Sequence, residues 1–570
     1  MSFFLKKTNN KKGTYLQIYQ GFYDPDRGHA VQLSYKPIGY VHQLIAEGIE
    51  DPIAHFKLEV DKLNQQAALD KIEAKSKLIS DESPEKYLGY FPLKNINDAL
   101  GVRSHLNLLQ THYNFDFNAY ELLSSLIYAR FINPCSKYKT FHDVVPKLFD
   151  HYDYSLNQLY SALNFFGSEY EKIIQIYNNF ISKKYYFDTT ISYFDCTNFY
   201  FEIDKEDDLR LKGPSKENRR DPIVSMALLL DAHQIPIGMK IFPGNQSEKP
   251  LLKEVIQSLK TNQDITGKTI RVADKGLNSS QNIVDALKEG DGYIFSKSVK
   301  MLSETEKTWI LLDNDYQDVL NSKGEVVYRI KECIDDFAYT ITLENGKKRC
   351  IQLKEKRVVS YNPQLAKKKE IEIKKQIEKA KKLKASQAKR SEYGDSAKYV
   401  QFESTDKDGN TTEGKVKVSI NQAAIDKALQ LAGYNMIVTS EVHFSAEYIY
   451  ETYHNLWRIE ESFKIMKSQL EARPVYLQKE DSIIGHFLVC YLSVVLMRLL
   501  QFKELKNQYG SEEIVRFMKD FRVVQISSNR YINLSKSTSF IKEFKDITKL
   551  ALTSYYLSKG QIKSVLNNRF

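Results

Sequence analysis

The order of strand-like and helix-like segments between residues 190 and 296 most constrains the fold of this 570-residue chain. Runs rich in β-branched and aromatic residues predict strands, and apolar residues at helical spacing predict helices. Strands are expected at 190–202, 223–230, 235–242, 269–274 and 292–296, and helices at 248–259 and 279–287. A hairpin turn is expected at Asp231 to Gln234. The pattern predicts an α/β fold with three antiparallel strands followed by helix, strand, helix and strand.

Two aspartates stand out within this pattern. Asp195 interrupts an apolar strand, where aspartate is rare and an ionised carboxylate is costly unless it is paired or metal-bound. Asp274 ends the fourth strand, and carboxylates at the carboxyl ends of strands often belong to α/β sites. The alternative for Asp274 is an Asx turn or a helix cap.

A third acid lies in a segment with two helical patterns. Tyr453, Glu460 and Lys467 are spaced seven residues apart, close to two helical turns, so one continuous helix would present all three on one face. The spacing of a buried helix face is shown by Leu456, Ile459, Phe463, Met466 and Leu470. We therefore expect a helix packed on the core with these three groups along its margin. A solvated surface face is the alternative.

The order of elements is the pattern of an RNase H-like core. In that fold, acids on the first strand, after the fourth strand and on a late helix converge on two divalent metal ions. Asp195, Asp274 and Glu460 occupy the corresponding places in this chain.

The chain also resembles the DDE transposases of bacterial insertion sequences, most of all the group with the signature Tyr-x2-Arg-x3-Glu-x6-Lys. Tyr453, Glu460 and Lys467 match that signature in residue and spacing, whereas Leu456 stands at the arginine position. This departure indicates a diverged branch. The resemblance covers roughly residues 185 to 500. Further matching segments are 193–198, 243–248, 273–277, 467–476 and 485–487.

The resemblance implies catalysis with two Mg2+ ions, for which Mn2+ can substitute, held by the three acids. It further implies that Lys467 pairs with a phosphate near the cleaved bond and that Tyr453 contacts the DNA backbone or an unpaired base. Trp457 is expected either to stack on a flipped base or to belong to the core. Additional candidates for DNA contacts, each with plain solvent exposure as the alternative, are Lys216, Arg219, Arg220, Arg458 and Lys464.

Composition fits an intracellular DNA-binding protein without proving one. Lysine and arginine number 82 against 72 acids, which gives a net charge of +10 and permits an approach to phosphates. Five cysteines without metal-ligand spacing point to a reducing compartment and argue against structural zinc. The apolar stretch 487–500 is too short for a membrane span and predicts a buried helix behind the active site. We expect a cytoplasmic, nucleoid-associated bacterial protein that does not enter a membrane.

The segments outside the core are placed by their patterns and by the resemblance. Residues 301–438 predict a β-rich insertion domain with a basic arm at 367–390, which is either an exposed charged helix or an arm that follows DNA phosphates. The expected regions are 1–105 (mixed α/β, terminal-repeat binding), 106–187 (helical), 188–300 (core, first part), 439–500 (core, second part) and 501–570 (helical, dimer contacts).

The activity implied by the resemblance is cut-and-paste transposition. The protein would bind double-stranded DNA at the terminal inverted repeats, cleave at the element ends and join them to target DNA, as a homodimer on paired ends. Three alternatives remain: a metal-dependent nuclease without strand transfer, a non-catalytic DNA-binding relic of a transposase, and an α/β protein whose acids are structural.

Overall fold

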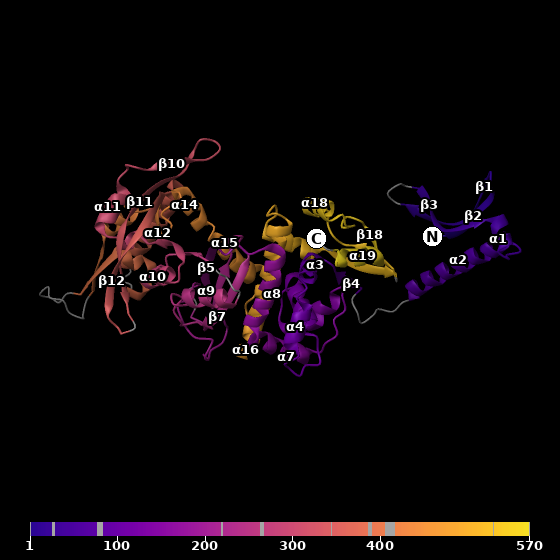
Figure 1. Cartoon of the computed structure of the whole chain (residues 1–570), viewed down its shortest axis with the longest axis horizontal. Helices are drawn as coiled ribbons and strands as arrows, with labels where there is room; N and C mark the ends of the chain where they lie inside the picture. Colours follow the sequence, from indigo (N-terminus) through magenta and orange to yellow (C-terminus); the bar gives the residue numbers. More distant parts are fainter. Residues whose placement is uncertain are drawn as a thin grey trace. The chain divides into compact units, whose positions relative to one another are not determined.

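The computed structural model describes residues 2–24, 29–76, 84–217, 220–262, 267–343, 345–385, 390–404, 416–527 and 529–568. The chain divides into two compact units. The first comprises Met1–Pro84 with Gln525–Tyr531, and the second comprises Glu85–Val524 with Ile532–Phe570 (Figure 1). Each unit has a hydrophobic core of its own.

The first unit is a three-stranded antiparallel sheet with two packed helices. Leu16, Leu44 and Phe56 form its small core. The side chain of Asn64 accepts a hydrogen bond from the backbone N–H of Phe3 (2.8 Å) and donates to the Phe3 carbonyl (2.9 Å), which fixes a helix to the edge strand. The elements are β1 (Ser2–Asn10), β2 (Gly13–Asp24), β3 (His29–Tyr40), α1 (Val41–Ala46) and α2 (Pro52–Ser76).

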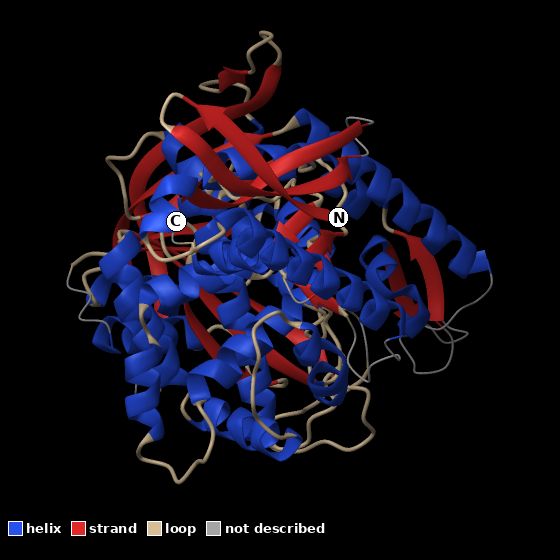
Figure 2. Ribbon diagram, turned by 90° about the vertical axis from the view of Figure 1, so that its right-hand side faces the viewer, coloured by secondary structure: helices blue, strands red, loops and turns tan. Residues whose placement is uncertain are grey.

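A nine-stranded sheet forms the centre of the second unit, and Figure 2 shows strands in red and helices in blue. In spatial order its strands are β10 (Gln317–Leu320), β11 (Val326–Thr342), β12 (Lys348–Tyr361), β15 (Tyr434–Thr439), β9 (Gly292–Lys297), β8 (Ile270–Ala273), β5 (Ile191–Tyr200), β6 (Ile223–Leu230) and β7 (Pro236–Pro243). β5, β8 and β9 run parallel, and all other neighbours are antiparallel. The five strands expected between residues 190 and 296 are present in the expected order.

The two helices expected between these strands lie on one face of the sheet. They are α9 (Leu251–Asn262) and α10 (Ser280–Lys288). Phe194 and Cys196 of β5 share a hydrophobic cluster with Leu252 of α9 and Ile283 of α10. Because successive side chains of a strand point to opposite faces, Asp195 points to the other face of the sheet.

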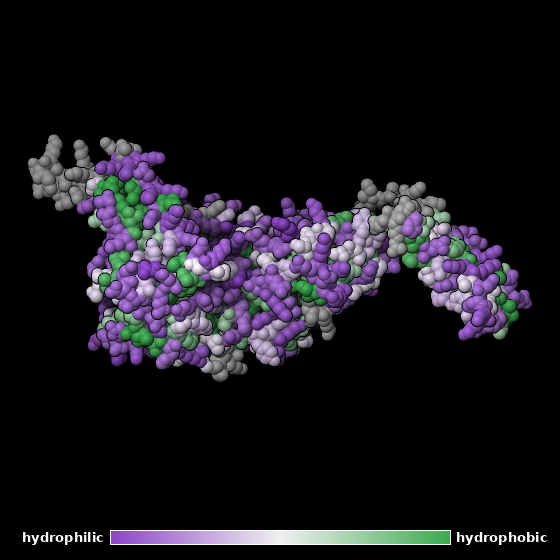
Figure 3. Space-filling model, turned by 90° about the horizontal axis from the view of Figure 1, so that it is seen from above, coloured by the Kyte–Doolittle hydropathy of each residue, from purple (hydrophilic) through white to green (hydrophobic). Residues whose placement is uncertain are grey.

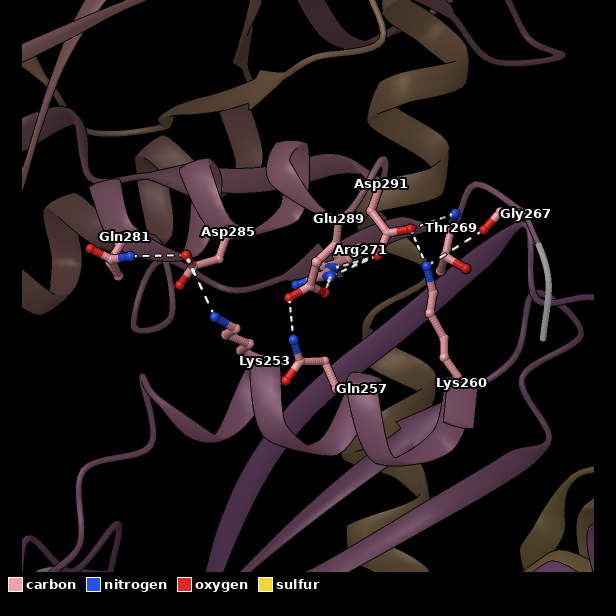
Figure 4. A network of polar contacts seen from close by, with 10 residues as sticks. All are labelled: Lys253, Gln257, Lys260, Gly267, Thr269, Arg271, Gln281, Asp285, Glu289 and Asp291. Carbon is pink, nitrogen blue, oxygen red and sulfur yellow. Dashed lines mark hydrogen bonds and ion pairs between the residues drawn. The ribbon is translucent and has the colours of Figure 1, made fainter. Parts of the chain in front are cut away.

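A buried ionic network fixes β8 (Figure 4). Arg271, in the middle of this short strand, is fully buried and pairs with Asp291 (2.6 Å between Nη2 and Oδ2) and with Glu289. Lys260 of α9 contacts the same Asp291. Removing one partner of a buried ion pair costs about 3–5 kcal/mol. The network therefore holds in place the strand that ends immediately before Asp274.

The segment between β9 and β15 extends the central sheet. Its main feature is the long hairpin β11–β12, and β15 joins this hairpin to β9. The remaining elements are η3 (Val299–Met301), α11 (Glu304–Leu311), α12 (Pro363–Ala385), η4 (Arg390–Tyr399), β13 (Val400–Ser404), β14 (Val416–Ile420) and α13 (Gln422–Gln430). The insertion thus adds strands to the sheet that carries Asp195 and Asp274.

The basic arm expected at 367–390 is largely helical, since 363–385 form α12, while 386–389 lie outside the described residues. Ile373 is buried in a cluster with Tyr399 and Ile425, so one side of α12 packs on the insertion. Its lysines at 374, 375, 379 and 382 are exposed. This arrangement is that of an exposed charged helix, and its contact with DNA stays a prediction.

Helices occupy most of the second unit outside the sheet. They are α3 (Phe91–Leu100), α4 (Arg103–Gln110), α5 (Ala119–Ile132), α6 (Lys137–Lys139), η1 (Thr140–Val144), η2 (Val145–Lys147), α7 (Leu156–Ser168), α8 (Tyr170–Tyr185), α16 (Glu480–Arg498) and η6 (Leu499–Glu504). Residues 480–504 are long and apolar enough to cross a membrane, but 94% of that window is buried inside the protein, as in a core helix. The buried helix predicted at 487–500 is confirmed.

The C-terminal region, which was expected to be helical at 501–570, contains strands as well as helices. Its helices are α17 (Ser511–Asp520), α18 (Ser539–Thr548) and α19 (Lys559–Asn567), and its strands are β16 (Arg522–Ser527), β17 (Arg530–Asn533) and β18 (Tyr556–Ser558). β4 (Glu85–Tyr87) completes a four-stranded sheet in the order β18-β17-β16-β4. Strands this short that pair with distant segments leave little local pattern in a sequence.

Figure 3 shows a mainly hydrophilic surface with separate hydrophobic patches.

Candidate active site

Asp195 and Asp274 come from neighbouring parallel strands. The register pairs Phe194 of β5 with Ala273 of β8, so the next residue of each strand path is an aspartate. Phe194 and Ala273 both belong to the hydrophobic cluster on the α9 and α10 face. Alternation of side chains turns the following carboxylates toward the opposite face. Two acids that are distant in the sequence are thereby placed side by side.

Asp195 is a half-buried carboxylate next to one ammonium group. Its Oδ1 accepts a hydrogen bond from the backbone N–H of Cys196 (2.8 Å) and lies 3.8 Å from Nζ of Lys216. Burial raises the pKa of Asp195 to about 6, and Lys216 opposes that rise while Glu248 and Asp274 add to it. A carboxyl group in these surroundings favours a cation as its neighbour.

Glu248 is a fourth acid of the site, and the sequence reasoning left it unassigned. Its Oε1 lies 3.6 Å from Nζ of Lys216, whose ammonium also donates to the Cys196 carbonyl. The ammonium of Lys216 therefore stands between the carboxylates of Asp195 and Glu248. The sequence feature that could have identified Glu248 is its position at the end of the polar turn that follows β7.

Tyr453 contacts the acid site through its hydroxyl group. The hydroxyl donates a hydrogen bond to Oδ1 of Asp274 (2.9 Å). Burial is the largest cause of a raised pKa for Tyr453, and the charges of Asp274 and Glu460 raise it further. Tyr453 stays a proton donor at neutral pH and fixes the orientation of Asp274. Its predicted contact with DNA stays a prediction.

The segment that carries Glu460 is divided, and the expected single continuous helix was wrong. α14 (Ala446–His454) ends before α15 (Trp457–Lys464), which continues as the π-helix η5 (Ile465–Gln469). Between them Leu456 N–H bonds to the Tyr453 carbonyl and Arg458 N–H to the Asn455 carbonyl (both 3.0 Å), three residues back instead of four. Sequence periodicity does not reveal such a local change in hydrogen bonding.

The apolar stripe of this segment is confirmed. It is buried at Leu456, Ile459, Phe463, Met466 and Leu470. Leu456, at the arginine position of the signature, is thus part of the core and makes no polar contact with its side chain.

Glu460 is exposed on the first turn of α15. Its charge contributes to the raised pKa of Tyr453, which is bonded to Asp274. Within the part of the chain that the structure describes, no group of three or more His, Cys, Asp and Glu side chains is close enough to hold a metal ion. The role of Glu460 as a metal ligand therefore stays a prediction.

Lys467 and Arg473 share one carboxylate. Lys467 Nζ lies 3.3 Å from Oε1 of Glu217, and Arg473 pairs with Oε2 of the same residue. Both cations also lie over aromatic rings of β5, at 5.3 Å from the centroid of Phe199 for Lys467 and 4.9 Å from that of Tyr200 for Arg473. Burial lowers the pKa of Lys467, while Glu217 opposes that change. Arg473 was not singled out from the sequence.

The other predicted DNA contacts lie in different surroundings. Trp457 is 48% exposed with the Arg458 guanidinium 3.7 Å from its ring centroid, so it is not a core residue. Arg458 also pairs with Glu461 (3.2 Å). Lys464 pairs with Glu512 at the surface, Arg220 is exposed, and Arg219 lies outside the described residues. Their contacts with DNA stay predictions.

The donor set of the site suits a hard divalent cation. Carboxylate oxygens, which Asp195, Glu248 and Asp274 supply, are the ligands that Mg2+ and Mn2+ prefer. Lys216 now provides positive charge between Asp195 and Glu248.

A large mixed sheet with acids at neighbouring parallel strands, bordered by lysine and arginine, defines an α/β enzyme suited to an anionic substrate. The transposase DDE domain family matches residues 205–496, just over half of the chain, and the chain belongs to this family. It is a DNA transposase, and members of this family generally use divalent metal ions. The match includes Asp274 and Glu460 and begins after Asp195.

No curated protein matches the chain. Among solved structures, the cryo-EM structure of the piggyBac transposase synaptic complex with hairpin DNA is similar at 9% sequence identity and a TM-score of 0.36. The similarity covers 77% of this chain and 79% of that chain. Values this low transfer no detail of that complex to the present protein.

Proposed function

We propose that this transposase moves a bacterial insertion sequence by cut-and-paste transposition, with Asp195, Asp274 and Glu460 as its catalytic acids. The observation that carries the proposal is the placement of two aspartates on neighbouring parallel strands, with Tyr453 of the signature segment bonded to Asp274. Three antiparallel strands followed by two parallel ones, β7-β6-β5-β8-β9, support an RNase H-like core.

The acids would hold two Mg2+ ions, for which Mn2+ can substitute. When bound, such ions activate the attacking oxygen and stabilise the leaving oxygen of a phosphodiester. Asp195, whose carboxyl pKa is affected by Lys216, Glu248 and Asp274, would be one of the residues that hold these ions. Tyr453 holds Asp274 in one orientation through its hydrogen bond.

Lys467 and Arg473 are the side chains that we assign to the DNA phosphate near the cleaved bond. Both are cations at one edge of the acid site, and both are paired with the single carboxylate of Glu217. A lysine supplies a point charge to phosphate, and an arginine supplies a planar pair of donors. Phosphate has to replace Glu217 on them when DNA binds.

We assign DNA-end recognition to the first unit and strand joining to the second. The β1–β2 hairpin carries exposed lysines at 6, 7, 11 and 12, and such a cluster suits phosphate contacts. The substrates are the terminal inverted repeats of the element and the target DNA. We further propose a homodimer on paired ends, with dimer contacts from residues 501–570, acting in the bacterial cytoplasm at the nucleoid.

The test is cleavage and joining by the purified protein on labelled duplexes that carry the ends of its own element, with Mg2+. Asp195→Asn and Glu460→Gln should abolish both reactions while end binding persists. The control is Asp116→Asn, which removes an exposed carboxylate in the loop before α5 and should retain both reactions.

Each alternative predicts a different result in the same experiment. Cleavage without joined products would identify a nuclease and overturn the proposal. End binding without cleavage by the wild-type protein would identify a non-catalytic relic. Full activity of Glu460→Gln would remove Glu460 from the catalytic set.

A further inference from the structure

A cavity of about 540 Å³ lies in the second unit between the segment that follows α5 and the segment that follows η5. Arg130 of α5 and Lys137 of α6 line it together with Arg473, which follows η5, and His486 of α16. Arg130 and Lys137 are 6% and 7% exposed, so two cationic side chains are buried within one small space. Charges are rarely buried without a partner of opposite sign.

The two buried cations are bonded to a neutral histidine. Arg130 donates to Nδ1 of His486 (3.3 Å) and to the Leu470 carbonyl (3.4 Å), and Nζ of Lys137 lies 3.0 Å from the same Nδ1. Nε2 of His486 lies 3.0 Å from the Ala472 carbonyl. The ring therefore donates from Nε2 and accepts at Nδ1, which is the neutral tautomer.

The two buried cations of the cavity have no carboxylate partner among the described residues. Within the described ranges, no carboxylate lies at ion-pair distance from Arg130 or Lys137, and the Glu471 carboxylate in the cavity lining is exposed. Burial and the charge of Arg130 hold the pKa of Lys137 well below its usual range. Burial and both cations likewise lower the pKa of His486. A bound anion would relieve this imbalance.

The mouth of the cavity suits a nucleic acid rather than a small anion alone. Two tyrosines in its lining, Tyr138 and Tyr476, are 57% and 69% exposed, and bases stack on such rings. Arg473 joins the cavity to the candidate active site, because it pairs with Glu217, the residue after Lys216. Lys216 in turn lies 3.8 Å from Asp195.

We propose that this cavity binds a phosphate group of the DNA strand that enters the active site, through Arg130 and Lys137. Tyr138 and Tyr476 stack on bases next to that phosphate. The inference rests on the proposed function, since the acid site is what brings the DNA strand there. Free inorganic phosphate offers the same chemistry, so the test has to separate the two sources.

The test compares Lys137→Met with the control Lys172→Met, which removes an exposed lysine of α8. Inorganic phosphate, compared with chloride at equal ionic strength, should raise the melting temperature of the wild-type protein and of the control. Lys137→Met should lose that rise. For an oligonucleotide, the slope of log affinity against log salt should become smaller by about one in Lys137→Met only.

Two further variants keep the inference testable if Lys137→Met does not fold. Lys139→Gln removes an exposed cation of the lining and should weaken oligonucleotide binding with a smaller salt slope. Tyr476→Ala should weaken binding of a single strand without a change of slope, because stacking releases no counterions.

The remaining outcomes decide between the two sources and the two proposals. A lost phosphate effect with unchanged oligonucleotide binding would make this a free-phosphate site and overturn the DNA assignment. Unchanged phosphate and oligonucleotide binding in Lys137→Met would overturn the site itself. A wild-type protein that binds DNA through Lys137 but cuts none would support the cavity while contradicting the proposed catalysis.

Discussion

At the scale of single residues, one loop places opposite charges on two parts of the candidate site. Lys216 puts an ammonium between Asp195 and Glu248, and the next residue, Glu217, puts a carboxylate on two cations. On the proposed function, a metal ion would compete with the ammonium of Lys216, and a DNA phosphate would compete with the carboxylate of Glu217. Either ligand would therefore favour displacement of the same loop.

Glu217→Gln should increase affinity for duplex DNA a few-fold. The carboxylate competes with phosphate for Lys467 and Arg473, and a partly exposed ion pair of this kind is worth up to about 1 kcal/mol. Fluorescence anisotropy at constant salt measures the effect. Glu202→Gln, an exposed residue at the start of the same loop, serves as the control. Unchanged or weaker binding by Glu217→Gln would contradict the competition.

Asp231 should make stability depend on pH. Burial raises its pKa to about 7, with Asp188 adding to the rise, and Lys503 and the backbone N–H groups of Ile235 and Asp188 opposing it. The folded protein then binds this proton more tightly than the unfolded chain does. The unfolding free energy should therefore fall as pH rises from about 4 to about 7, by at most about 1.4 kcal/mol per pH unit.

The comparison of Asp231→Asn with wild type measures that contribution. Asparagine does not titrate, so denaturant unfolding at several pH values should show a smaller fall for the variant, whatever its absolute stability. The exposed Asp208→Asn should keep the wild-type slope. If the unfolding free energy of Asp231→Asn showed the same slope against pH as that of wild type, the proton would be bound by another group.

The expected turn at 231–234 is confirmed, and the side chain of Asp231 closes it by accepting a hydrogen bond from the Ile235 N–H (2.8 Å).

At the scale of elements, sequence patterns were informative where local chemistry decides the structure. The run around Asp195 is a strand because β-branched and aromatic residues dominate it, and Asp274 follows a strand as its position indicated. Contacts between distant segments could not be predicted in this way. Glu248 and Arg473 join the site through the loop at Lys216 and Glu217, and no spacing within the sequence encodes that meeting.

Gly485→Ala should destabilise the helical part of the second unit. A Cβ at this position would clash with the backbone carbonyl oxygen of Leu163, because α16 and α7 cross closely there. Overpacking of a tight core typically costs about 1–3 kcal/mol. Gly560→Ala is a matched control in α19, where a Cβ would meet only the Ser558 hydroxyl at 3.8 Å. Equal melting temperatures for both variants would show that the helices can separate without cost.

At the scale of the whole molecule, the two units should unfold separately. The small core of the first unit includes Leu44, which is 7% exposed, whereas Leu58 in the same unit is 63% exposed. Leu44→Ala should lower the stability of the first unit by about 2–5 kcal/mol and shift only one calorimetric transition. Leu58→Ala should shift neither. If calorimetry showed only one unfolding transition and Leu44→Ala shifted it as a whole, the two units would unfold together.

The continuity of the central sheet has a consequence during protein synthesis. β9 is synthesised when about half of the chain has been made, its outer neighbour β15 follows only after the whole insertion, and α15 comes later still. On the proposed assignment, a nascent or truncated chain that ends before Glu460 carries both aspartates but lacks the third acid. The cell would thus hold no cutting-competent fragment until most of the polypeptide has been translated, which protects its chromosome from incomplete enzyme.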